Sequence, residues 1–260
     1  MKDILHRIKS YCKYLVTAKT KYYLHSPFVF EFYTHVLEGK NDISAIENLR
    51  YSLLKSNHNI SFVDLGNEGK KYTRKISTIT KKSAIASKYG KVLLNAVAHF
   101  KPKTILELGT NIGIGTCYLA NGNNGAQIFT IEGSKELSQI AQQNANKLEI
   151  KNINFEVGNF DAVLLSILKK IEQVDFVFID GNHKKEATLR YFEEILNFCN
   201  ECSIIVFDDI YWSEEMTEAW EIIKQHEQVK LTIDIYRMGF VFFQKSKLKK
   251  ENFQLFFKKS

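Results

Sequence analysis

ILELGTNIGIGT, residues 105–116, is an apolar strand that runs into a glycine-rich turn and then into a helix. Glycine at positions 109, 113 and 115 allows positive φ values and leaves room for a ligand where a Cβ atom would collide. The spacing does not fit a dinucleotide site, because a G-x-G-x-x-G motif starting at Gly113 would need its third glycine at Tyr118. The phosphate-binding motif G-x-x-x-x-G-K-[ST] is missing from the sequence. The turn therefore predicts a ligand without a pyrophosphate.

Two acidic residues flank this turn, each at the end of a predicted strand. Glu107 precedes the turn and suits a ligand that carries a cationic amine. Glu132 ends the next strand, where a carboxylate can accept hydrogen bonds from both hydroxyls of a ribose. A nucleoside bearing an amino acid, such as S-adenosylmethionine, meets both requirements. The alternative for Glu132 is a cap on the following helix, with Gly133 and Ser134 as loop.

Four stretches carry a family resemblance, in this order: ELGTNIGIGT (107–116), TIEG (130–133), DFVFIDGNH (175–183) and IIVFDDIYW (204–212). With them, residues 84–244 resemble the class I S-adenosylmethionine-dependent methyltransferases, most closely the bacterial O-methyltransferase-like group. The resemblance implies S-adenosylmethionine as cofactor and methyl transfer to an oxygen of a small-molecule acceptor. It implies cofactor contacts from Glu107, Gly109, Thr110, Asn111, Gly113, Gly115, Thr116, Glu132, Gly133, Asn159, Phe160 and Asp180.

The loop after the third strand of this segment is where related methyltransferases recognise the adenine. Asn159 fits a contact with the exocyclic amine, and Phe160 fits an apolar contact with the ring. Asp161 then caps the following helix. A plain turn asparagine is the alternative for Asn159.

A second polar cluster follows the next two predicted strands and supplies the catalytic candidates, Asp180, His183, Asp208 and Asp209. Three neighbouring carboxylates raise one another's pKa unless a cation or a donor lies among them. In catechol-type O-methyltransferases an acid and an Asp-Asn pair hold a divalent cation that lowers the pKa of a substrate hydroxyl.

The metal question stays open at this point, with Asp180, Asp208 and Asp209 as the ligands if a cation binds. This chain has Asp-Asp in place of Asp-Asn and lacks the lysine that those enzymes often place after the first acid. In the metal-free alternative, Asp180 or His183 acts as the general base. A surface histidine that caps a helix is the third interpretation of His183.

The remaining pattern predicts an α/β fold. We expect a Rossmann-like, seven-stranded, mostly parallel sheet with helices on both faces, because the strands are short apolar runs between helical segments. Only residues 237–239 separate the last two strands, so the last strand must be antiparallel. The methyltransferase resemblance implies seven strands, with this reversed strand near the edge of the sheet. The predicted helices are 87–100, 114–122, 135–148, 160–171, 184–198 and 213–227; the predicted strands are 104–108, 127–131, 153–157, 174–179, 202–208, 230–236 and 240–244.

Three domains are expected: a helical extension (1–83), the methyltransferase-like domain (84–244) and a basic C-terminal tail (245–260). The extension shows helical periodicity at 3–18, 26–38 and 43–54. It either shapes a substrate pocket or covers a sheet edge. Residues 62–69 resemble a cofactor turn, but the Lys/Thr-rich stretch that follows does not suit a buried helix, so we interpret them as a loop.

Bulk properties narrow the remaining choices. The 260 residues carry a net charge of +7, with lysines concentrated at both ends, and four cysteines are too few for a disulfide framework. No apolar run reaches membrane-spanning length, and a cytoplasmic location follows. RNA is a minor alternative partner because Phe253, Phe256 and Phe257 interleave with lysines, although helical packing explains them more simply. A homodimer, a nicotinamide-dependent oxidoreductase and a non-catalytic Rossmann-like binding module stay open as alternatives.

Overall fold

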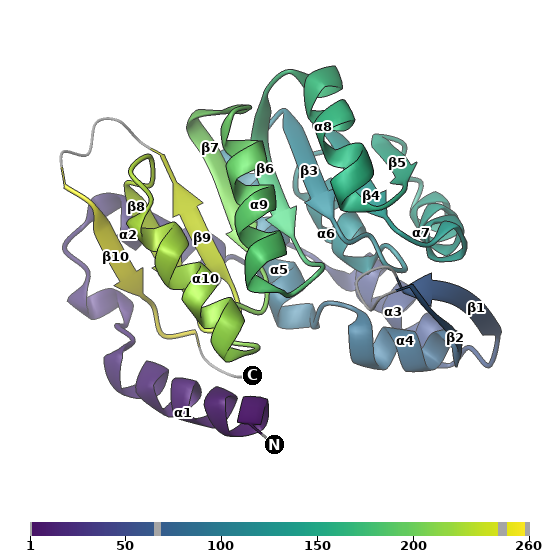
Figure 1. The fold of residues 1–260 in the computed structure, drawn as a ribbon, viewed down its shortest axis with the longest axis horizontal. Coiled ribbons are helices and arrows are strands. Elements are labelled where there is room, and N and C mark those ends of the chain that lie inside the picture. The colour runs from purple at the N-terminus through teal and green to yellow at the C-terminus, as the bar shows by residue number, and fades with distance from the viewer. Residues whose placement is uncertain (1, 65–68, 244–248, 258–260) are drawn as a thin grey trace. The chain divides into compact units, whose positions relative to one another are not determined.

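The computed structural model describes residues 2–64, 69–243 and 249–257 (Figure 1). The chain divides into two compact units, and each is treated by itself. The first unit comprises Met1–Thr34 and Ile171–Ser260, and the second comprises His35–Lys170. Among the described residues, no helix is long and apolar enough to cross a membrane.

The second unit contains three parallel strands of the main sheet: β3 (Thr104–Leu108), β4 (Gln127–Glu132) and β5 (Ile153–Val157), in the order β3-β4-β5. The register places Leu108 beside Ile131 and Glu132 beside Val157, so the three strands end at one level. The helices of this unit are α3 (Ser44–Leu54), α4 (Ile76–Ser83), α5 (Ser87–Phe100), α6 (Ile114–Gly122), α7 (Lys135–Lys147) and α8 (Phe160–Ile171).

The first unit contains five strands in the order β10-β8-β9-β7-β6. The reversed strand is β9, which runs antiparallel to both β7 and β8, as the short connection predicted. The strands are β6 (Val174–Ile179), β7 (Cys199–Phe207), β8 (Leu231–Asp234), β9 (Gly239–Phe242) and β10 (Glu251–Gln254). The helical segments are α1 (Lys2–Thr17), η1 (Lys21–Tyr23), α2 (Pro27–Phe32), α9 (Lys185–Leu196) and α10 (Glu214–Gln225), and a π-helical segment, η2 (Tyr33–Leu37), continues α2.

Strand β9 shows how helices cover both faces of this unit. Phe240 and Phe242 point to one face and meet the rings of α2, with Phe32 at 5.0 and 6.1 Å between centroids. Gly239 opens the other face to α10, because an added Cβ there would lie 2.6 Å from the Trp220 ring. The α/β class with a mostly parallel sheet, one reversed strand and covering helices is confirmed.

Within the described residues the main sheet has eight strands, so the expected number of seven is wrong. The additional strand is β10, which pairs in parallel with β8 in a region expected to be a tail with its phenylalanines on a helix. Polar side chains stabilise the pairing of β10 with β8. Asn252 accepts a hydrogen bond from Thr232, and Gln254 donates one to Asp234. Those partners lie on β8, about 20 residues earlier, and a four-residue strand shows too little periodicity to be recognised. Residues 245–248 and 258–260 of the predicted tail lie outside the described residues.

The N-terminal segment also differs from the expectation, because it is not entirely helical. β1 (Asn59–Asp64) and β2 (Lys70–Lys75) form an antiparallel hairpin, and α4 follows directly. The predicted loop falls partly on residues 65–68, which lie outside the described residues. The side chains of β2 alternate between exposed and partly buried. The partly buried positions hold Tyr72 and Arg74, and lysines and a threonine fill the exposed ones, so no alternation of apolar residues marked the strand.

Tyr14 anchors α1 to the C-terminal segment, and this contact is testable. Its hydroxyl donates to the Leu255 carbonyl at 2.6 Å and accepts from the Phe257 amide at 2.9 Å. We expect Tyr14→Phe to lower the free energy of unfolding by about 1–3 kcal/mol, because both buried backbone groups lose their partner. Urea unfolding measures this change. Tyr22→Phe, at a tyrosine that is 84% exposed, is the matched control and should leave stability unchanged.

Candidate functional site

The glycine turn after β3 depends on left-handed backbone conformations. Gly109 and Gly113 have φ values of 106° and 79°, and Asn111 has 52°. At Gly113 a Cβ would also lie 2.8 Å from Ala141 on α7, so glycine is required there twice. The amides of Gly109 and Thr110 both donate to the Ile131 carbonyl, at 3.0 and 3.2 Å. The turn is thereby fixed against the carboxyl end of β4.

Glu132 completes this attachment. Its Oε2 accepts from the Asn111 amide at 2.7 Å, and its Oε1 accepts from the Ser134 amide at 3.0 Å. The alternative role of Glu132 as a helix cap fails, because Ser134 is the N-cap residue of α7 and its side chain accepts from the Leu137 amide. These two backbone donors fix the orientation of the Glu132 carboxylate at the carboxyl end of β4.

Glu107 is fully buried beneath the turn. Its Oε2 accepts from Thr116 at 2.5 Å and from Thr130 at 2.6 Å. Thr130 donates its only hydroxyl proton to Glu107, so Thr110 must be the donor in the 2.5 Å contact between the two threonines. Burial raises the pKa of Glu107 to about 7, against the lowering effect of the two hydroxyl donors.

The other oxygen of Glu107, Oε1, is buried and has no hydrogen-bond partner among the described residues. A buried acceptor without a donor is costly, and a cationic or N–H-bearing ligand group removes that cost. The side chains of Thr110 and Thr116 point into the interior, so cofactor contacts from these two positions would come from the backbone.

The other predicted cofactor residues of this unit lie close in sequence to the same strand ends. Gly115 is in the first turn of α6, and Gly133 is in the loop after β4. Asn159 is exposed, directly precedes α8 and accepts from the Asp161 amide at 3.0 Å. Phe160 is partly buried. Asn159 therefore has its amide NH₂ group at the surface while its oxygen shapes the turn.

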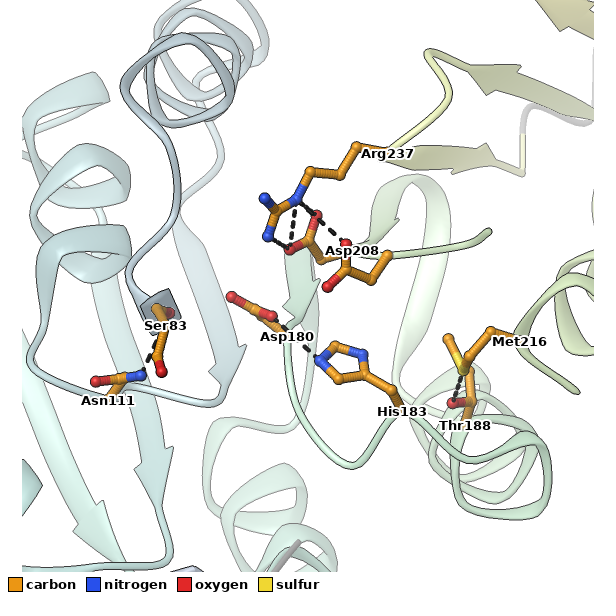
Figure 2. A network of polar contacts seen from close by, with 9 residues as sticks. Ser83, Asn111, Asp180, His183, Thr188, Asp208, Met216 and Arg237 are labelled. Carbon is orange, nitrogen blue, oxygen red and sulfur yellow. Dashed lines mark hydrogen bonds and ion pairs between the residues drawn. The ribbon is translucent and has the colours of Figure 1, made fainter. Parts of the chain in front are cut away.

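The second predicted cluster lies in the first unit, where β6 and β7 end side by side (Figure 2). The register pairs Ile179 with Phe207, so Asp180 and Asp208 follow at the same level. His183 Nε2 lies 3.7 Å from Asp180 Oδ1. The structure thus brings these predicted residues together. Because Lys184 is the N-cap residue of α9, the interpretation of His183 as a helix cap is wrong.

Arg237 is the cation of this cluster, and sequence reasoning missed it. Its guanidinium binds Asp208 in a forked geometry, with Nε 2.9 Å from Oδ1 and Nη2 2.6 Å from Oδ2. Its Nε also lies 3.4 Å from Asp209 Oδ1. The three carboxylates, Asp208 above all, raise the pKa of Arg237 against the effect of burial. The three neighbouring acids in the sequence did indicate that a cation should lie among them. No sequence pattern indicated that Arg237, in the β8–β9 turn, supplies that cation.

This donor set does not fit a divalent cation. Both oxygens of Asp208 are bound to Arg237, and the side chain has no exposed surface. Among residues 2–64, 69–243 and 249–257, no group of three or more His, Cys, Asp or Glu side chains is arranged to hold a metal. The charge that a metal would supply is supplied by the guanidinium.

The surroundings of Asp209 shift its pKa upward. Burial and the neighbouring Asp208 carboxylate raise its pKa to about 6, while the charges of Arg237, His183 and Arg7 oppose that shift. Its backbone is left-handed, with a φ of 53°. A carboxyl group that titrates near neutral pH can accept a proton under working conditions.

The two aromatic residues beyond β7 have different roles. Tyr211 donates to Asp234 at 2.6 Å and accepts from Gln254 at 3.0 Å, so its hydroxyl links β8 to β10. Trp212 is 47% exposed, with the Arg7 guanidinium 4.4 Å over its ring and the His183 ring 6.5 Å away. Only Trp212 presents an open surface to an acceptor.

Comparison with known proteins agrees with this geometry. Residues 106–210 match the family model described as "Methyltransferase domain". The chain contains a methyltransferase domain of the class I fold. The matched residues run from within β3 to just beyond β7, so they include the carboxylates of both polar clusters, whereas Arg237 lies beyond them. The resemblance stated from the sequence is confirmed.

Solved structures share the fold of this methyltransferase domain. An O-methyltransferase from Bacillus cereus in complex with SAH has 20% identity and a TM-score of 0.55, covering 83% of this chain and 97% of that one. TomG, an O-methyltransferase from Streptomyces achromogenes in complex with SAM, has 16% identity and a TM-score of 0.59, covering 82% and 94%. The SAH-bound methyltransferase PaMTH1 from Podospora anserina has 15% identity and a TM-score of 0.57, covering 79% and 98%. No curated protein matches the sequence.

The raised pKa of Glu107 predicts how stability depends on pH. Between pH 4.5 and about 7 the folded state holds a proton that the unfolded chain has lost, so stability falls as pH rises through this window. A shift from 4.5 to about 7 corresponds to roughly 3 kcal/mol. Glu107→Gln should remove this part of the slope in urea unfolding at pH 5 and pH 8. Equal slopes in wild type and variant would disprove the assignment; the exposed Glu215→Gln is the control.

The Arg237–Asp208 pair predicts strong coupling. Arg237→Met should destabilise the fold by about 3–5 kcal/mol, because Asp208 is left buried without a counter-charge. The double variant Asp208→Asn/Arg237→Met should recover most of that loss. A double-mutant cycle from chemical denaturation measures the coupling, and additive single effects would contradict it.

Proposed function

We propose that this protein is an S-adenosylmethionine-dependent methyltransferase that methylates an oxygen of a small-molecule acceptor. The observation that carries the proposal is the pair of carboxylates around the glycine turn, within the segment that matches the methyltransferase family. The Bacillus cereus and Streptomyces achromogenes O-methyltransferases, which share the fold, were crystallised with SAH and SAM. Their bound molecules support the choice of cofactor.

We place the cofactor contacts of the second unit at the two carboxylates and at the loop after β5. Glu132, whose carboxylate is oriented by two backbone amides at the end of β4, receives the two ribose hydroxyls. Glu107 Oε1, which is buried without a partner among the described residues, receives the amino group. Asn159 and Phe160 contact the adenine. The positive φ values at Gly109 and Gly113 favour glycine. Because glycine has no side chain, these positions leave room for the aminoacyl portion of the cofactor.

The acceptor side is proposed for the cluster in the first unit. The cofactor supplies an activated methyl group on a sulfonium, so the protein mainly aligns the acceptor oxygen and removes its proton. His183, next to Asp180, and Asp209 are the proposed bases. Asp208 acts through Arg237, which it holds in place. Metal assistance is not part of the proposal because the donors do not fit it.

The other expectations from the sequence stay predictions. They are a cytoplasmic location, a homodimer and, as a minor alternative, RNA as partner.

Isothermal titration calorimetry with S-adenosylhomocysteine tests the cofactor site. We expect binding to wild type, and a loss of roughly tenfold or more in Glu132→Ala, because two charge-assisted hydrogen bonds to the ribose are removed. The matched control is Glu136→Ala, at an exposed carboxylate on α7. Wild-type affinity in Glu132→Ala, or no binding at millimolar ligand, would refute the proposal.

The same titration predicts a proton release from Glu107. At pH 6 the residue is largely protonated in the unliganded protein and must ionise to receive a cationic amine. Repeating the titration in buffers of different ionisation enthalpy should show close to one proton released at pH 6 and almost none at pH 8.5. Glu107→Gln should release none at either pH. Equal proton release at the two pH values in wild type would exclude Glu107 as the amine ligand.

A further inference from the structure

Helix α1 is docked on the first unit through its polar side. His6 Nε2 lies 2.8 Å from Thr217 Oγ1 on α10, and the Arg7 carbonyl accepts from the Tyr236 hydroxyl at 2.9 Å. Further along, Tyr11 meets the Tyr236 ring edge-on at 4.8 Å. The buried Tyr14 completes this face through its bonds to the C-terminal segment.

The apolar side chains of α1 point away from the protein. Val16 is 87% exposed, Leu5 is 70% and Ile8 is 56%. The complete outward set is Ile4, Leu5, Ile8, Cys12, Leu15 and Val16. An amphipathic helix of a globular protein normally buries its apolar stripe, so the orientation of α1 is the reverse of the usual one. We call these six residues the α1 apolar face.

Charges are segregated around this face. At about 100° per residue, its six side chains span an arc of about 120°, and Lys2, Lys9 and Lys13 occupy the next 40° or so along one border. Lys9 and Lys13 are exposed, whereas Lys2 lies 3.9 Å from Glu214. Asp3 is the acid of this helix and lies on the far side of the wheel. The exposed aromatic residues Tyr22 and Tyr23 follow shortly after the helix.

We propose that α1 attaches this protein to the surface of an anionic lipid bilayer, with the apolar face lying in the interface and the lysine border facing the headgroups. An apolar stripe bordered by lysines and followed by tyrosines is what such a surface binds. A helix of 16 residues is about 24 Å long, too short to span the roughly 30 Å hydrocarbon core, so it lies in the plane.

A second copy of the chain fits this face less well. One helix about 24 Å long and about 10 Å wide offers far less than the roughly 800 Å² per partner of a stable interface. Antiparallel symmetric pairing would also bring the lysine borders of two copies to the same side, and like charges are unfavourable there. A lipid surface with negative headgroups has neither disadvantage.

Flotation of the full-length protein with vesicles tests the proposal. We expect binding to phosphatidylcholine vesicles that contain phosphatidylglycerol, little binding to phosphatidylcholine alone, and weaker binding as salt rises. Ile8→Glu should weaken binding by roughly tenfold or more, because the bilayer interface would no longer bury an isoleucine side chain and a negative charge is added. Lys9→Ala/Lys13→Ala should weaken it by about 25-fold, at about fivefold for each lysine.

Controls separate the α1 face from general charge and apolarity. Ile222→Glu changes an apolar side chain on α10 that is 46% exposed, and Lys151→Ala/Lys184→Ala removes two exposed lysines elsewhere. Both should bind vesicles like wild type. Equal binding by Ile8→Glu and wild type overturns the proposal. The proposal is also overturned if the wild-type protein binds no vesicles and sedimentation equilibrium shows a wild-type dimer that Ile8→Glu abolishes. Cofactor binding is not involved, so the result is independent of the proposed function.

Discussion

The attachment of the glycine turn to the end of β4 is the constraint on which the cofactor site depends. Three successive amides, those of residues 109–111, donate to the last residues of that strand, two to a carbonyl and one to the Glu132 carboxylate. The left-handed conformations at Gly109, Asn111 and Gly113 are tolerated because these bonds hold the backbone in place. Beneath the turn, Glu107 keeps one oxygen satisfied by two hydroxyls and the other without a partner among the described residues. The scaffold is preorganised, and its remaining acceptors suit a cationic, hydroxyl-bearing molecule.

In the acidic cluster at the ends of β6 and β7, several carboxylates lie close together and are stabilised by a nearby positive charge. Carboxylates at the ends of β6 and β7 are neutralised by a guanidinium from the β8–β9 turn rather than through a set of metal ligands. A fixed internal cation forms a forked ion pair with the buried Asp208, while burial and the Asp208 carboxylate raise the pKa of Asp209 to about 6. Neighbouring acids in this cluster thus have separate tasks, one as an anchor and one as a titrating group.

Much of the fold was predictable because its strands and helices are long enough to show their own periods. From α5 to β6 the predicted and observed boundaries agree within one residue. The failures have a common cause. Strand β10 pairs with β8, which precedes it by about 20 residues, and strand β2 is composed mostly of basic residues, so neither shows an apolar strand period of its own. The same limit applies to the site: Glu107, Glu132 and the strand-end acids stand in recognisable motifs, whereas Arg237 acquires its meaning only when the hairpin brings it to Asp208.

The pairing of the two ends of the chain has a consequence for biosynthesis. Helix α1 is secured by residues near the C-terminus, through the Tyr14 contact with Leu255 and the pairing of Lys19 with the same segment. A ribosome adds about 5–20 residues per second, so roughly 12–50 s separate the emergence of the helix from that of its anchor. During that interval Tyr14 lacks its C-terminal partners, and the docked face of α1 is not yet fully covered. A transcript cut short before codon 251 would leave α1 with its contacts to Thr217 and Tyr236 but without the C-terminal partners of Tyr14 and Lys19.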